Sequence, residues 1–194
     1  MNGEYPPGAT PLTPAEEEGL IPVHITLRGE LNELEQANIL AAETWLLTRR
    51  GRKTVVDPRF LKELHRRMFG QVWKWAGEYR KVDRNIGVSW PMISYQTEAL
   101  CRDVEYWRKE KVYPADELAV RFHHKLVWIH CYPNGNGRHS RLASDLLVIE
   151  LGCPRFSWGS ADLYEAGDLR RRYIDALHNA DNHNIGPLLA FARD

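Results

Sequence analysis

The sequence predicts an all-α fold with one small β-hairpin. Apolar residues recur at helical spacing along most of the chain, and signals for helix starts accompany them. Alternating runs rich in Val, Ile and Thr are scarce, which argues against an extensive β-sheet. The 194 residues, of which 43% are hydrophobic and 27% charged, suffice for one domain with a sizeable core.

A short helix is predicted first, at about residues 14–19. Thr13 can cap it, Pro14 suits its first position, and Glu16 completes a capping box. From Glu30 a longer apolar repeat predicts a second helix. We therefore divide the chain into an N-terminal segment, residues 1–29, and a main domain, residues 30–194.

The later elements follow from the same kinds of signal. The pair Asp57-Pro58 begins a helix that ends at Gly70. Between Trp73 and Ile93, glycines and a proline interrupt weak strand formers, which places the hairpin there. Helical patterns then cover about residues 97–109, 114–130 and 136–151, with shorter helices after residues 160 and 168 and a last helix after residue 187.

Charge and cysteine content exclude several classes of function. The 26 Lys and Arg residues balance 26 Asp and Glu residues, so a general polyanion binder is not expected. Three widely spaced cysteines offer neither a disulfide framework nor a CxxC zinc site. The sequence has no secretory signal and no apolar run long enough to span a membrane, so we expect a cytoplasmic protein without membrane contact.

The segment from His130 to Arg141 carries the chemistry. It reads His-Cys-Tyr-Pro-Asn-Gly-Asn-Gly-Arg-His-Ser-Arg between two apolar helices. Gly135 and Gly137 allow successive N–H groups to surround an anion, and the helix that follows adds its N-terminal donors. Arg138 and Arg141 can then meet phosphate oxygens bidentately. With His130 as a general base, this pattern indicates phosphoryl-type transfer.

This segment closely resembles the Fic family motif HxFx[D/E]GNGRxxR. Tyr132 stands at the Phe position, and the residues that match the motif are His130, Gly135, Asn136, Gly137, Arg138 and Arg141. The resemblance continues through residues 75–80 and 173–177 and covers most of residues 30–193. The sequences of the loop and of the N-terminal segment resemble those of the subgroup called mobile mystery protein B.

The resemblance implies protein adenylylation, in which a target Ser, Thr or Tyr hydroxyl attacks the α-phosphate of ATP. His130 would take the hydroxyl proton, the amides of residues 135–137 would hold phosphates, and Arg138 and Arg141 would neutralise the β- and γ-phosphates. Asn182 matches a position that lines the nucleotide pocket of the family. The target would dock on the hairpin as a flap, which includes Val82, Asn85, Ile86, Gly87 and Val88.

Asn134 departs from the family motif, which has an acidic residue at this position. That carboxylate normally helps to hold Mg²⁺, and an asparagine carbonyl is a poorer ligand, so Mg²⁺ is expected with weakened protein contacts. Two alternatives therefore stay open. The chain could be a phosphotransferase with another donor, as in the related Doc branch, or a module that binds a nucleotide or partner without turnover.

Many Fic proteins also carry an inhibitory [S/T]xxxE[G/N] helix, whose glutamate pairs with the second arginine of the motif. Glu18-Gly19 matches the end of this pattern, although Pro14 stands at its first position, so Glu18 is the predicted inhibitory residue. A solvated run of Glu16 to Glu18 is the alternative.

The expected binding partners are implied by the resemblance and not by the composition. The resemblance implies an unidentified target at the flap and, through the subgroup, a helix-turn-helix partner protein, and it leaves self-association open. The basic runs at residues 49–53 and 170–172 are expected to be solvated helix ends, so direct binding of nucleic acid is not expected.

Overall fold

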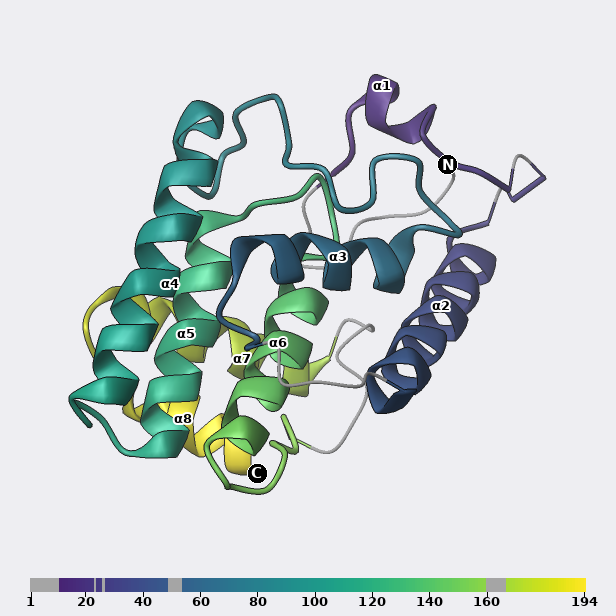
Figure 1. Cartoon of the computed structure of the whole chain (residues 1–194). Helices are drawn as coiled ribbons and strands as arrows, with labels where there is room; N and C mark the ends of the chain where they lie inside the picture. Colours follow the sequence, from purple (N-terminus) through teal and green to yellow (C-terminus); the bar gives the residue numbers. More distant parts are fainter. Residues whose placement is uncertain (1–10, 23, 26, 49–53, 160–166) are drawn as a thin grey trace.

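The computed structural model of the protein describes residues 11–22, 24–25, 27–48, 54–159 and 167–194 (Figure 1). These residues form an almost entirely helical structure. In chain order the elements are α1 (Pro14–Glu17), α2 (Arg28–Thr48), α3 (Pro58–Phe69), the 3₁₀ helix η1 (Trp90–Met92), α4 (Ile93–Lys109), α5 (Ala115–Ile129), α6 (Asn136–Glu150), α7 (Asp168–Asp181) and α8 (Gly186–Arg193).

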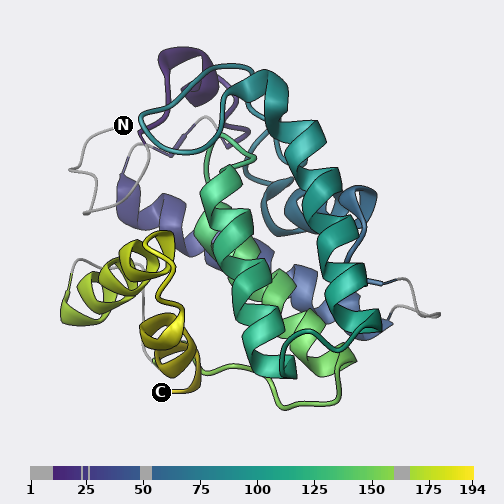
Figure 2. The same cartoon turned by 90° about the vertical axis from the view of Figure 1, so that its left-hand side faces the viewer.

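Helices α5 and α6 form the centre of the molecule. They lie side by side, with α4 packed on α5, α3 between α6 and α2, and α8 against both α5 and α7 (Figures 1 and 2). The core residues of this central pair are fully buried and include Phe122, Leu126, Ala143 and Leu147. Because the two helices share this core, the short loop that joins them is held at both ends.

The predicted helix starts at Thr13 and Asp57 are confirmed. In the capping box, Glu16 Oε2 accepts from the backbone N–H of Thr13 at 2.8 Å, and Thr13 Oγ1 accepts from Glu16 N–H at 3.4 Å. Asp57 Oδ1 accepts from Arg59 N–H at 2.7 Å. Both caps are local, so they could be recognised from neighbouring residues alone.

Several helix limits differ from the sequence-based limits. Helix α2 begins at Arg28 rather than Glu30. The division of the chain into residues 1–29 and residues 30–194 stays a prediction. Helix α4 begins at Ile93 rather than residue 97, because η1 leads directly into it. Helix α7 is long rather than short, and the helix predicted after residue 160 falls outside the described residues.

The predicted hairpin is wrong for the described residues. Residues 82–89 run as bends without strand pairing, and an isolated antiparallel bridge joins Leu20 to Trp73 instead. The buried side chain of Arg80 explains the difference. Its guanidinium group donates to the carbonyl oxygens of Val82, at 2.8 Å, and of Val88, which a partner strand would otherwise satisfy. None of the described helices is both long and apolar enough to cross a lipid bilayer.

Candidate active site

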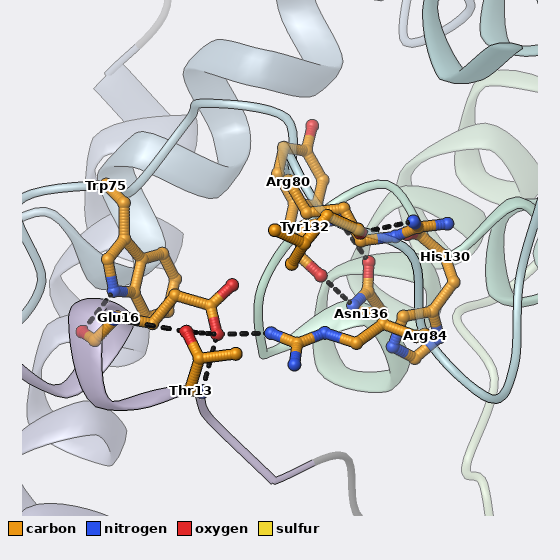
Figure 3. Close-up of polar contacts among 9 residues, drawn as sticks. Thr13, Glu16, Trp75, Arg80, Arg84, His130, Tyr132 and Asn136 are labelled. Atoms are coloured by element: carbon orange, nitrogen blue, oxygen red, sulfur yellow. Dashed lines mark hydrogen bonds and ion pairs between the residues drawn. The ribbon is translucent and has the colours of Figure 1, made fainter. Parts of the chain in front are cut away.

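The loop between α5 and α6 brings the predicted base and the predicted anion site together. His130 ends α5 in the left-handed conformation, with φ 56° and ψ 60°, and Gly135 caps α6 with φ 78°. Asn136 closes the loop between them, since its side chain accepts from Tyr132 N–H at 2.9 Å and donates to Tyr132 O at 2.8 Å (Figure 3). The buried Asn136 side chain therefore shapes the loop, while its backbone N–H belongs to the helix terminus.

Helix α3 contacts this loop through an aromatic ring and a histidine. A Cβ atom at Gly135 would lie 2.6 Å from the ring of Phe69, so the loop backbone and the ring pack too closely for a side chain. His65 Nδ1 accepts from Gly77 N–H at 3.0 Å, so its other nitrogen donates to Asn134 O at 3.1 Å. This role of His65 could not be predicted, because the residue lies in an ordinary amphipathic helix.

His130 is neutral at physiological pH. Burial and then the charge of Arg80 lower its pKa to about 4, and Arg84 contributes further. Arg80 also donates from Nε to the carbonyl oxygen of His130 at 2.7 Å, and its backbone N–H donates to Cys131 O at 3.0 Å. These bonds hold the backbone at His130 in place, and its neutral imidazole can accept a proton without first losing one.

Arg138, in the first turn of α6, already contacts a carboxylate. Its Nη1 lies 2.5 Å from Oε2 of Glu35, a residue of α2 that is only 4% exposed. Trp73 Nε1 donates to the other carboxylate oxygen at 2.6 Å. The negatively charged carboxylate of Glu35 therefore lies beside one of the two arginines predicted to bind phosphate. Sequence reasoning missed Glu35, because it lies 103 residues away from Arg138.

Arg141 lies on the side of α6 that faces α7. Its guanidinium group is 5.4 Å from the ring centre of Tyr173, whose hydroxyl group is 3.0 Å from His123 Nε2. Burial, then Arg141 and Arg138, lower the pKa of Arg170. Arg170 was predicted to be a solvated helix end, but it is half-buried and adds a third positive charge beside these two arginines.

Asn134 does not offer a site for a divalent cation. Its Oδ1 accepts from Gly135 N–H at 2.6 Å and from Arg138 Nη2 at 3.3 Å, so its carbonyl oxygen is already used by two donors. In the part of the chain that the structure describes, no group of three or more His, Cys, Asp or Glu side chains could hold a metal ion. These residues do not fit a protein-bound Mg²⁺.

The remaining predicted site residues lie at the edges of the site. Val82, Asn85 and Ile86 are exposed, and Gly87 lies against His130. The N–H of Val88 donates to Ile129 O at 3.3 Å, which attaches the segment to the end of α5.

Asn182 is exposed at the C-terminal end of α7, where its amide donates back to His178 O at 2.9 Å. Its place in a nucleotide pocket stays a prediction.

Glu18 does not reach either arginine. It is exposed at the end of α1, and within the described residues its carboxylate forms no ion pair. Helix α1 instead presents Glu16, which pairs with Arg84 (Figure 3). The position of Glu18 is set by the short helix, because the capping box turns Glu16 inward and leaves Glu18 on the outer side.

Comparisons with known proteins agree with this geometry. Residues 55–148 match the model of the Fic/DOC family. The protein adenylyltransferase Fic of Aedes aegypti is 30% identical over 136 residues, which cover 68% of this chain and 26% of the relative. The protein adenylyltransferase fic-1 of Caenorhabditis briggsae is 30% identical over 152 residues, with 76% and 28% covered. The chain thus spans about a quarter of the length of these curated relatives.

Solved structures show the same fold. The BepC protein of Bartonella tribocorum, solved with bound AMPPNP, superposes with a TM-score of 0.71 at 16% identity and covers 94% of this chain and 97% of its own. Fic-1 of C. elegans, residues 134–508, gives a TM-score of 0.66 at 21% identity, with 94% and 54% covered. The helical arrangement, the loop between α5 and α6 and these matches identify the chain as carrying a domain of the Fic/DOC family.

Proposed function

We propose that this chain is a protein adenylyltransferase that transfers AMP from ATP to a Ser, Thr or Tyr hydroxyl of a protein target. The observation that carries the proposal is a buried, neutral His130 at the end of α5, joined by a short loop to the N-terminus of α6, with Arg138 and Arg141 on that helix. The matched curated relatives are named protein adenylyltransferases, which supports the same reaction.

The residues divide the reaction between them. The target hydroxyl oxygen forms a bond to the α-phosphorus while His130 takes its proton, and the bond to the β-phosphate oxygen breaks to release diphosphate. The backbone N–H groups at the start of α6 and the two arginines stabilise the negative charge of the phosphates. Because Asn134 is a neutral residue already bonded to two donors, no step depends on a metal held by the protein.

We also assign self-inhibition to Glu35 rather than to Glu18. Its carboxylate pairs with Arg138, so phosphate binding at this guanidinium group must displace it. The buried position of Glu35 and the hydrogen bond from Trp73 keep the carboxylate there. A carboxylate at this position competes directly with the phosphates of ATP.

Two labelled forms of ATP test the reaction. Wild type, Glu35→Gln and His130→Ala are incubated with α-labelled and with γ-labelled ATP, and protein-bound label is measured. We expect label from the α-phosphate only, a loss of transfer in His130→Ala, and a gain of about tenfold in Glu35→Gln, which equals about 1.4 kcal/mol. Label from the γ-phosphate would instead indicate a kinase, and the absence of both labels would indicate a binding module.

Matched variants control the inhibition test. Glutamine at position 35 still accepts from Trp73 but no longer holds Arg138 by charge. Glu33→Gln removes a charge from the exposed side of the same helix, and Glu18→Gly tests the residue first predicted to inhibit. Neither should raise transfer. A gain in Glu18→Gly without one in Glu35→Gln would overturn the assignment.

A further inference from the structure

Arg84 is a buried cation next to the predicted base, and its role is not explained by the reaction above. Its side chain is only 9% exposed, and its charge helps to lower the pKa of His130, after burial and Arg80. Figure 3 shows the side chain passing beside His130, with the guanidinium group pointing towards Glu16. A positive charge so close to the base lies within reach of whatever presents a hydroxyl group to it.

Glu16 covers Arg84 as part of a strap, which we define as residues 11–22. Glu16 Oε2 contacts Arg84 Nη2 and also accepts from the N–H and Oγ1 of Thr13, each at 2.8 Å. Burial alone would raise the pKa of Glu16, but these hydrogen bonds and the charge of Arg84 outweigh it and lower the pKa. Glu16 is therefore a fixed, charged carboxylate at neutral pH.

Three backbone and side-chain contacts hold the strap on the body of the protein. Trp75 Nε1 donates to Glu16 O at 3.0 Å, Lys74 N–H donates to Gly19 O at 2.9 Å, and Ile21 N–H donates to Val72 O at 2.9 Å. None of them involves the segment that carries Arg84. Among the described residues, the strap is thus linked to residues 82–89 through the ion pair of Glu16 with Arg84.

The guanidinium group of Arg84 is only partly satisfied by this contact. Its Nε–H is buried and has no hydrogen-bond partner among the described residues. Arg80 differs, since its Nε, Nη1 and Nη2 atoms all donate to backbone carbonyl oxygens and fasten the same segment. A buried donor without a partner is costly, whereas a carboxylate placed side-on can bind Nε–H and Nη2–H together. Glu16 uses one of these two donors.

We propose that Arg84 recognises an acidic side chain in the docking segment of the target protein, and that Glu16 holds this position until the target binds. The proposal rests on the proposed function, in which a hydroxyl-bearing segment approaches His130 along residues 82–89. An acidic residue near that hydroxyl replaces Glu16, bonds both donor edges of Arg84 and detaches the strap from the segment. The target is therefore a protein with an acidic residue close to the modified Ser, Thr or Tyr.

Peptide selection without nucleotide tests this recognition separately from AMP transfer. The full chain with Glu16→Gln captures peptides from a random library with a fixed central threonine, and the bound peptides are sequenced. We expect Asp and Glu to be enriched about tenfold over Asn and Gln beside the threonine. Wild type, with Arg84 covered, should enrich them less. Glu17→Gln, which removes a neighbouring charge from the same turn, should behave like wild type.

Variants of Arg84 decide the outcome. With Glu16→Gln in the background, Arg84→Gln should abolish the preference for acidic peptides and Arg84→Lys should keep part of it, while thermal unfolding checks that each chain is folded. No acidic enrichment in Glu16→Gln, or enrichment that survives Arg84→Gln, would overturn the proposal. A loss of ATP binding in Arg84→Gln with unchanged peptide selection would also overturn it, because Arg84 would then serve the nucleotide. Absent AMP transfer alongside acidic selection would refute the adenylyltransferase proposal alone.

Discussion

Replacing Gly87 by alanine tests whether residues 82–89 hold His130 in its neutral, buried state. Gly87 has φ +88°, and a Cβ atom there would lie 2.6 Å from the Cβ atom of His130 and 3.1 Å from the carbonyl oxygen of Ile129. Since carbon atoms in contact lie about 3.5–4.0 Å apart, the segment must move away by about 1 Å.

The cost has two parts. The left-handed backbone costs alanine about 1 kcal/mol, and displacement of a packed segment costs about 2 kcal/mol, so the free energy of unfolding should fall by about 3 kcal/mol. Gly152 supplies a matched control, because it has φ +87° and a Cβ atom there would meet nothing within 4 Å. Gly152→Ala should therefore lose only about 1 kcal/mol.

Urea unfolding measures both losses, and NMR titration of the histidine side chains follows the second effect. As the segment moves away, the pKa of His130 should rise from about 4 towards about 6.5, the ordinary value for histidine. Equal losses of stability in Gly87→Ala and Gly152→Ala would refute the steric reasoning. A pKa that stays near 4 in Gly87→Ala would show that this segment does not control His130.

Three further predictions concern stability and metal dependence. Burial lowers the pKa of His139 to about 4, so the unfolded chain binds more protons as the pH falls below about 6.5. Because of this residue, the free energy of unfolding should drop by about 2 kcal/mol between pH 7 and pH 5. In His139→Gln the difference between urea unfolding at pH 7 and at pH 5 should be smaller by that amount. Asp145 accepts from Trp158 Nε1 and Arg155 Nε, each at 2.8 Å. Asp145→Ala should lower the free energy of unfolding by about 3 kcal/mol, whereas a value within about 0.5 kcal/mol of wild type would contradict this role. Asn134→Asp restores a hard anionic ligand, so AMP transfer should depend more steeply on Mg²⁺ than in wild type; identical Mg²⁺ titrations would disprove it.

Local features of the fold could be predicted from the sequence because neighbouring residues determine them. The caps at Thr13 and Asp57 depend on residues within one turn, and the loop from His130 to Arg141 carries its own turn and helix signals. The predicted base, glycines and arginines all lie at the junction of α5 and α6. These residues belong to one contiguous segment, so their residue types and spacing were enough to predict the site.

Contacts between distant segments could not be predicted in this way. Glu35 reaches Arg138 only because α2 packs on α3, and Glu16 rather than Glu18 pairs with Arg84 because the capping box orients the turn. The predicted hairpin is wrong because the Arg80 side chain donates to carbonyl oxygens that would bond a neighbouring strand in a hairpin. Each of these depends on one side chain that reaches across the fold.

The left-handed backbone at His130 has a consequence for the balance between stability and activity. A helix that stops in this conformation favours glycine, and any side chain with a Cβ atom costs about 1 kcal/mol there. Folding alone would therefore select glycine at position 130. The histidine carries that cost, which the proposed function explains through its imidazole, so a glycine variant at position 130 that gained stability would lack the proposed base.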